Sequence, residues 1–217
     1  SHDELLFSIP KLSAVPPKGY LPDYPSTIYP FDILDYQAKT IVYDLKESRW
    51  MGSYSFTPEG FSILQNELYS YNDGQLYLHN QYDRQCYFYD TQYTAKIMFV
   101  SNVGAGLPKV YNNITAQSNL VPTFVYFYND YPIQQSSDLV DFSFRNIEGN
   151  FVANILRNKL VPTAGGYTTD GLLTGEVMRN IAMFVMVEFS PTGSNVMQLK
   201  FVDIGLRESI GNTTIKV

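Results

Sequence analysis

The sequence is poor in the residues that build most catalytic and metal sites. Its 217 residues include one cysteine, Cys86, and two histidines, His2 and His79. A lone cysteine excludes an intrachain disulfide, and in its aromatic surroundings we expect Cys86 to be a small buried hydrophobe. Because Ser1-His2 resembles the remainder of a cleaved expression tag, only His79 is left, which argues against histidine triads and excludes metal sites with two or more histidines. We expect His79, at the end of a strand, to be a surface or hydrogen-bonding residue.

Long apolar runs and clusters of basic residues are missing as well. The longest apolar run, Ile181–Val187, has the size of a strand, whereas a membrane-spanning helix needs about 20 apolar residues. The start of the chain shows no basic region followed by an apolar one, as a secretory signal would. The net charge is -6 and the 15 basic residues are scattered singly. We therefore expect neither a membrane span nor a nucleic-acid partner.

Aromatic residues are abundant instead. The chain has 18 tyrosines and 14 phenylalanines beside a single tryptophan. Tyrosine suits half-buried strand faces and contact surfaces, since its ring packs while its hydroxyl meets water or a partner. The composition therefore fits two interpretations, ordinary strand formation and an extensive contact surface.

Proline sets the beginning of the chain apart. Six prolines lie between Pro10 and Pro30, and proline blocks both helices and central strands. We interpret residues 1–35 as an extended arm whose apolar side chains lie against the domain or a neighbouring subunit, with a disordered tail as the alternative. Residues 36–102 are predicted to form a β-meander and residues 103–217 a β-sandwich, packed together as one unit.

Short apolar runs bounded by Gly, Asn, Asp or Pro predict an all-β fold, an antiparallel β-sandwich whose first sheet is a meander or a partial propeller. The clearest hairpin is at Asn72-Asp73-Gly74, because Asp-Gly between alternating runs supplies the positive φ angles that a tight turn needs. The predicted strands are Lys39–Leu45, Trp50–Phe56, Phe61–Leu64, Glu67–Tyr71, Gln75–His79, Cys86–Tyr89, Tyr93–Ser101, Pro122–Tyr128, Val140–Arg145, Phe151–Leu156, Ile181–Glu188 and Val196–Leu206.

Three segments of the second half carry more specific expectations. Ile181–Glu188 is apolar on both faces, so we expect a strand buried between layers that pairs with Met197–Ile204, where apolar residues such as Phe201 alternate with polar ones. A helix over Glu176–Val187 is the alternative on propensity, although its β-branched residues favour a strand. Asn158–Gly171 is predicted to be a long loop that binds something or becomes ordered on assembly.

Carboxylates are the remaining route to catalysis, since glycoside hydrolysis needs only two of them. The sequence offers no pairing among the candidates, and it contains neither the ligand spacing of a Ca²⁺ loop nor a glycine-rich phosphate loop. We therefore predict that the protein is not an enzyme, that it needs no cofactor, and that it has no catalytic, cofactor-binding or metal-binding residues. The candidate carboxylates are Glu59, Glu67, Asp73, Asp83, Asp90, Glu148 and Glu176.

Two series of short motifs stand out along the chain. They are Trp50, Tyr54–Glu59, Asn66–Tyr69 and Asn72–Asn80 in the first series, and Arg145–Asn154, Ile155–Arg157 and Leu173–Gly175 in the second. Both series resemble, in kind and order, segments of the tail-nozzle or muzzle-type virion proteins of crAss-like podoviral bacteriophages. The resemblance spans most of residues 40–210, but the chain is much shorter than those proteins and its proline-rich start has no counterpart in them.

The resemblance implies a non-enzymatic structural component of a bacteriophage virion, in the tail nozzle or an associated tail ring, that acts through protein–protein contacts. The expected partners are other tail proteins or copies of the chain itself in a homo-oligomer. The expected location is the virion, assembled in the bacterial host cytoplasm. Tyrosine-rich surfaces, an extended arm and long loops suit such an assembly.

Two alternatives stay open from the residues alone. One is a β-sandwich module that binds a surface glycan, on a phage fibre, at a bacterial cell surface or as a secreted protein, because exposed tyrosine and tryptophan rings suit sugars. The other is a fragment of a β-rich hydrolase.

Overall fold

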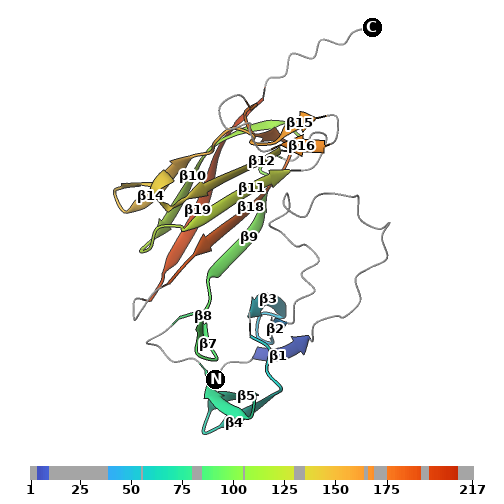
Figure 1. Cartoon of the computed structure of the whole chain (residues 1–217), viewed down its shortest axis with the longest axis vertical. Helices are drawn as coiled ribbons and strands as arrows, with labels where there is room; N and C mark the ends of the chain where they lie inside the picture. The colour runs from blue at the N-terminus through green and yellow to red at the C-terminus, as the bar shows by residue number, and fades with distance from the viewer. Residues whose placement is uncertain are drawn as a thin grey trace. The chain divides into compact units, whose positions relative to one another are not determined.

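Strands make up most of the structure, a computed structural model that describes residues 4–9, 39–54, 56–79, 85–104, 106–129, 135–163, 166–168, 175–191 and 196–209. Within these residues the one helical element is a short 3-10 turn, η1 (Asp141–Ser143). The predicted all-β fold with antiparallel sheets is confirmed. The chain divides into two compact units, Ser1–Tyr93 and Thr94–Val217, which are drawn in Figure 1 and described one at a time below. The described part of the chain contains no helix with the length and apolar character needed to cross a membrane.

The first sheet of the N-terminal unit includes a piece of the predicted arm. It consists of β1 (Glu4–Ile9), β2 (Lys39–Asp44) and β3 (Arg49–Tyr54), in that order and antiparallel. Strand β1 pairs with β2 along its whole length. Residues 10–35 of the predicted arm lie outside the described residues.

A three-stranded meander follows, as predicted, formed by β4 (Gly60–Leu64), β5 (Glu67–Asn72) and β6 (Gln75–Leu78). Asn72 faces Gln75 across the second hairpin. The two residues between them, Asp73 and Gly74, have φ angles of 50° and 70°, which is the conformation that favoured two-residue hairpin turns require. The turn predicted from Asn72-Asp73-Gly74 is therefore present in the structure.

Three more hairpins use the same two-residue turn with less obvious residues. Gln65 and Asn66 join β4 to β5, Tyr89 and Asp90 join β7 (Tyr87–Phe88) to β8 (Thr91–Gln92), and Glu148 and Gly149 join β13 (Arg145–Ile147) to β14 (Asn150–Asn154). All six turn residues have positive φ. A residue with a side chain costs roughly 1–2 kcal/mol in this region, so pairing of the flanking strands must stabilise Gln65, Tyr89 and Glu148 there.

The C-terminal unit is a sandwich of two antiparallel sheets (Figure 1). One sheet has the order β12 (Gln135–Val140), β11 (Phe124–Asn129), β18 (Met183–Phe189) and β9 (Ala95–Ser101). In the other, β10 (Lys109–Ser118) pairs along one side with β19 (Leu199–Glu208) and along the other with β14 and β17 (Arg179–Asn180), and β13 lies beyond β14.

Both sheets contribute to one hydrophobic core. Alternate residues of β18 point into it and are fully buried, and the facing sheet supplies residues of β10 and β14. Removal of so many apolar side chains from water is the main force that holds the two sheets together. The buried core residues are Tyr111, Ile114, Val125, Phe127, Leu139, Ala153, Met178, Met183, Val185, Val187 and Phe189.

The expectation for Ile181–Glu188 was right for the face that meets the core, where Met183, Val185 and Val187 are buried. It was wrong about the opposite face, where Phe184 is 42% exposed, and about the partner. Strand β18 is an interior strand, but it pairs with β11 and β9, whereas β19 pairs with β10 in the other sheet. The alternation expected through Phe201 also breaks. The register shifts between Ser118↔Leu199 and Gln117↔Phe201, so a β-bulge reverses the two faces of β19 and Phe201 is exposed while Val202 packs on the core.

Other differences arise where the residues of a segment are not typical of the structure that it forms. The predicted strand Val140–Arg145 is wrong, because β12 ends at Val140 and η1 follows. Strands β10 and β12 were not predicted, since Asn, Gln, Ser and Lys interrupt their apolar residues. The predicted loop Asn158–Gly171 contains a hairpin of β15 (Val161–Thr163) and β16 (Gly166–Thr168). The alternative helix over Glu176–Val187 is replaced by β17 and β18.

Candidate functional site

The arrangement closest to a catalytic constellation is a polar cluster around His79. Strand β5 supplies Ser70, the end of β6 supplies His79, and the β7–β8 turn supplies Tyr89. The Ser70 Oγ lies 2.6 Å from His79 Nε2 and 2.9 Å from the Tyr89 hydroxyl. Ser70 therefore connects the other two side chains by hydrogen bonds.

An aromatic shell surrounds these three residues. The His79 ring stacks on Phe56, with ring centroids 4.6 Å apart and an interplanar angle of 23°. Phe56 also lies against Phe88 at 4.5 Å, and Tyr89 meets Tyr77 edge-on at 4.8 Å. Both Ser70 and Phe56 are buried. We call Phe56, Ser70, His79, Phe88 and Tyr89 the His79 cluster.

The His79 cluster differs from a catalytic triad in two respects, although its histidine is in the neutral form that a general base needs. Burial lowers the pKa of His79, so the ring is held neutral at physiological pH. In the described residues no carboxylate pairs with this ring to orient it, as the third group of a catalytic triad would. The Ser70 hydroxyl, which would be the nucleophile of such a triad because it is hydrogen-bonded to His79, has no exposed surface. The cluster can hold β5, β6 and the β7–β8 turn together, and we assign it that role.

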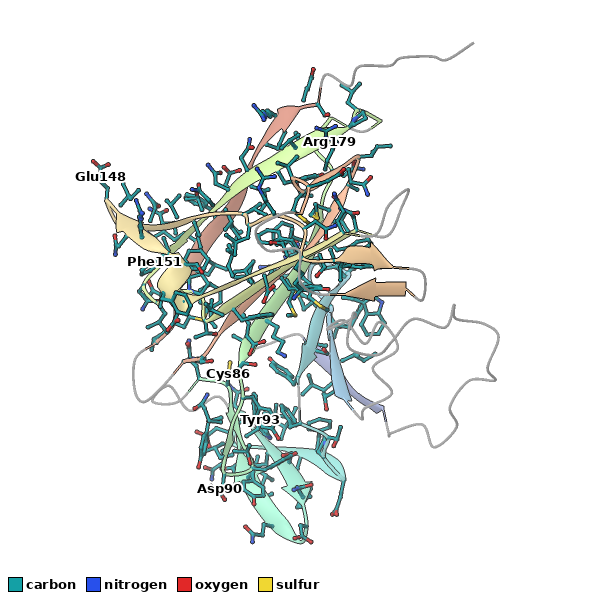
Figure 2. The ribbon with its side chains drawn as sticks, turned by 45° about the horizontal axis from the view of Figure 1, so that its top comes forward. Cys86, Asp90, Tyr93, Glu148, Phe151 and Arg179 are labelled. Atoms are coloured by element: carbon teal, nitrogen blue, oxygen red, sulfur yellow. The ribbon has the colours of Figure 1, made fainter. Side chains whose placement is uncertain are left out.

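The candidate carboxylates are spread over turns and surfaces. Asp73, Asp90 and Glu148 occupy positive-φ positions at hairpin tips, and Figure 2 labels Asp90 and Glu148 at the tips of two different hairpins. Glu67 accepts a hydrogen bond from the Tyr69 hydroxyl at 3.1 Å. Glu59 and Glu176 are exposed, and Asp83 lies outside the described residues. Among the described residues no group of three or more His, Cys, Asp and Glu side chains could hold a metal ion.

Cys86 has neither the exposure nor the electrostatics of a reactive thiol. It is half-buried before the β7–β8 hairpin, where Figure 2 labels it, and burial raises the pKa of its thiol. The thiolate, which is the nucleophilic form, is therefore disfavoured. Its carbonyl oxygen accepts a hydrogen bond from the Tyr93 amide at 2.7 Å.

A buried lysine in the C-terminal unit has no counterpart among the sequence predictions. Lys109, on β10, is 1% exposed and its Nζ donates to the carbonyl of Ile181. The hydroxyl of Tyr111 donates to the carbonyl of Ser101 at 3.2 Å, and burial raises the pKa of Tyr111 to about 12. These groups tie β10 to the ends of β9 and β18. The neighbours of Lys109 come from segments distant in sequence, so no local pattern could have indicated its burial.

Large apolar side chains are exposed in both units. In the C-terminal unit these include Phe142 in η1, 87% exposed, and Met98 on β9, 65% exposed. In the N-terminal unit Ile63 is 75% exposed and Trp50 is 60% exposed, with its ring edge-on to Tyr43 at 5.0 Å. Exposed apolar groups gathered on one face are typical of surfaces that bind other molecules.

Comparison with protein families matches residues 84–158 to the Crassvirus muzzle protein C-terminal domain. The predicted resemblance to crAss-like muzzle proteins is confirmed. The match covers less than half of the chain and includes the motifs Arg145–Asn154 and Ile155–Arg157, while the motifs of the first series, Trp50 to Asn80, lie outside it. A search of curated proteins finds no match.

The muzzle-type segment, residues 84–158, is not a complete structural unit. It contains the β7–β8 hairpin, which forms a two-stranded sheet of its own in the N-terminal unit, and strands β9 to β14, which come from both sheets of the sandwich. Among the residues that the structure describes, strand β9 pairs with β18 alone, and the full length of β10 pairs with β19. Since β18 and β19 lie beyond residue 158, the muzzle-type segment needs residues 183–208 to close the sandwich.

Proposed function

We propose that this protein is a non-enzymatic structural component of the tail of a crAss-like phage virion and acts through protein–protein contacts. The observation that carries the proposal is the match of residues 84–158 to a domain of the crassvirus muzzle protein. The partners are other tail proteins or further copies of the chain, and assembly takes place in the cytoplasm of the bacterial host.

The chemistry of the described residues supports a structural role. The His79 cluster is closed to solvent at Ser70, and the candidate carboxylates occupy turns on separate hairpins. Exposed apolar side chains on β3, β4, β9 and η1 offer surfaces for contact. Such surfaces are stabilised when a partner removes them from water.

The proposal is tested on virions of the phage that encodes the chain. Mass spectrometry of purified particles should detect the protein in a fixed ratio to the other tail proteins, and antibody labelling in electron microscopy should place it at the tail. Its absence from purified particles would refute the structural role.

Trp50 favours a second candidate function, the binding of a surface glycan. A largely exposed indole beside a tyrosine offers the apolar platform on which sugar rings stack. A glycan array distinguishes this function from assembly: binding that is lost in Trp50→Ala would support it. An array without hits, together with rings or other oligomers in electron microscopy, would eliminate it.

A further inference from the structure

Strand β9 is an open edge of the four-stranded sheet. Within the described residues it pairs with β18 on one side and with no strand on the other. In Figure 1 it is the green strand beside β18 at the margin of the sandwich. Because residues of an edge strand alternate in direction, half of its backbone amides and carbonyls point away from β18 and need a partner or water.

The features that usually protect an edge strand are absent from β9. It is seven residues long, contains no proline and pairs with β18 without a register shift. Its single charge, Lys96, lies 3.2 Å from Glu188 of β18 and is compensated by it. Edge strands of soluble proteins normally resist further pairing through prolines, bulges or uncompensated charges.

The outward face of β9 is apolar beyond Lys96, whose charge is paired with Glu188. Ala95 and Phe99 pack on the core, so Met98 and Val100 point to the opposite face, where they are 65% and 49% exposed. Phe184 of β18 lies beside Val100 in the register and is also exposed. These three side chains form an apolar row that reaches the open edge.

The opposite edge of the same sheet is covered. On β12 the amide of Ser136 donates to Asn158 Oδ1 at 2.9 Å, and its carbonyl accepts from the Lys159 amide at 2.9 Å. Ser137 Oγ donates to the carbonyl of Leu156 at 3.0 Å. Residues 156–159 therefore occupy the edge that a head-to-tail sheet would use, so copies of the chain cannot join β9 to β12.

Self-pairing of β9 remains geometrically favourable. In an antiparallel pair centred on Met98, Met98 faces Met98 of the partner and the other residues pair symmetrically around it. Facing side chains then lie on the same side of the joined sheet, and all seven residues of each strand are paired. Lys96 then faces Val100 of the partner, and the two lysines are four residues apart, roughly 14 Å at 3.4 Å per residue. This separation exceeds the Debye length of about 8 Å in physiological salt, so repulsion between them is small.

We propose that β9 pairs antiparallel with β9 of a second copy about a two-fold axis at Met98, which joins two four-stranded sheets into one. This inference names one partner for the assembly contacts of the proposed function and rests on it. The unpaired backbone groups of the two edges satisfy each other, and Met98, Val100 and Phe184 of both copies form one continuous apolar band.

Sedimentation velocity of the full chain over a concentration series tests the pairing. The wild type should pass from monomer to dimer, and Met98→Lys, which places two ammonium groups directly opposite each other, should weaken dimerisation by roughly tenfold or more. The matched control is Ile147→Lys, since Ile147 is exposed to a similar degree at a hairpin on the other sheet; it should dimerise like the wild type.

Thiol cross-linking tests the register. In the Cys86→Ser protein, which is otherwise free of cysteine, Met98→Cys should give a covalent dimer on mild oxidation, because residue 98 of each copy lies at the two-fold axis. Ile147→Cys in the same background should stay monomeric. Cross-linking that is equal in both variants would contradict the pairing.

The two proposals fail in different ways. A wild type that stays monomeric at its highest soluble concentration, or one that forms only open-ended aggregates, overturns the pairing of β9. Oligomers unaffected by Met98→Lys overturn it too, while they leave the structural role intact. The structural role itself fails only if the chain is absent from purified virions.

Discussion

The turn at Asp73-Gly74 allows a stability prediction whose magnitude follows from the backbone alone. Gly74 has a φ of 70°, and a Cβ built there meets no atom within 4 Å. A side chain at this position therefore causes no clash, and its cost is the strain of the left-handed region, about 1–2 kcal/mol. A β-branched residue resists that region more strongly. We expect Gly74→Ala to lower the free energy of unfolding by about 1 kcal/mol and Gly74→Val by more.

Gly60 provides a matched control in the same meander. Its φ is not positive, and a Cβ there would lie 3.7 Å from the ring of Tyr71, an ordinary contact. Replacement of glycine by alanine also restricts the unfolded chain, which stabilises a protein by roughly 0.4–1 kcal/mol where the native conformation is compatible. This contribution is common to Gly60→Ala and Gly74→Ala, so the difference between the two variants isolates the strain at Gly74. Gly74→Asn should recover part of the loss, since asparagine tolerates positive φ.

The assay is urea denaturation of the full chain, followed by the fluorescence of Trp50, the only tryptophan and a residue of the N-terminal unit. Variants are compared by the urea concentration at the midpoint of unfolding. Where the slope of the unfolding free energy against urea concentration is unchanged, a shift of the midpoint reports stability and not a change in the unfolded state. If Gly74→Val and Gly74→Ala unfold at the same midpoint as Gly60→Ala, the inference that the turn requires positive φ at this residue is refuted.

Three further predictions concern other positions in the two units. Because burial lowers the pKa of His79 below its usual 6.5, the unfolded chain takes up a proton first, and stability should fall as the pH drops from about 6.5 toward the folded pKa. His79→Gln should remove that slope, and an unchanged pH profile by Trp50 fluorescence would contradict burial of a neutral ring. Phe56→Ala should cost roughly 3–5 kcal/mol by urea denaturation, because Phe56 is 2% exposed; a loss under about 1 kcal/mol would show that Phe56 is not central to the His79 cluster. Gly205→Ala would place a Cβ 1.9 Å from Asn113 Oδ1 and should cost about 1–3 kcal/mol. Asn113→Ala in the same protein should relieve most of the cost, and equal losses in both backgrounds would exclude the clash.

Several features of the fold were predictable because they depend on residues close together in the chain. The turn at Asn72-Asp73-Gly74 follows from the φ preferences of its own residues, and the burial of alternate residues in β18 follows from an apolar run. The prediction that the chain has no catalytic residues likewise depends on composition, on the scarcity of histidine and cysteine, and it stays a prediction. The resemblance to muzzle proteins rested on short motifs, and the match of residues 84–158 bears it out.

Other features depend on which distant segments meet, and local patterns do not specify that. The polar residues of β10 and β12 are typical of loops, yet these strands pair with β19, β14 and β11. The bulge opposite Gln117 reverses the faces of β19, so Phe201 is exposed against the alternation of its sequence. One added residue in a pairing register moves every following side chain to the other face.

The sequence by itself determined that the chain is β-rich, where its clearest turn lies and which residue types it has few of, because these depend on residue type and on neighbours along the chain. The tertiary structure alone decided that His79 is buried beside Ser70, that the buried Lys109 donates to the carbonyl of Ile181, and that among the described residues β9 is an open edge while β12 is covered. Burial and edge exposure are properties of strand order, and strand order is set by contacts between segments up to a hundred or so residues apart.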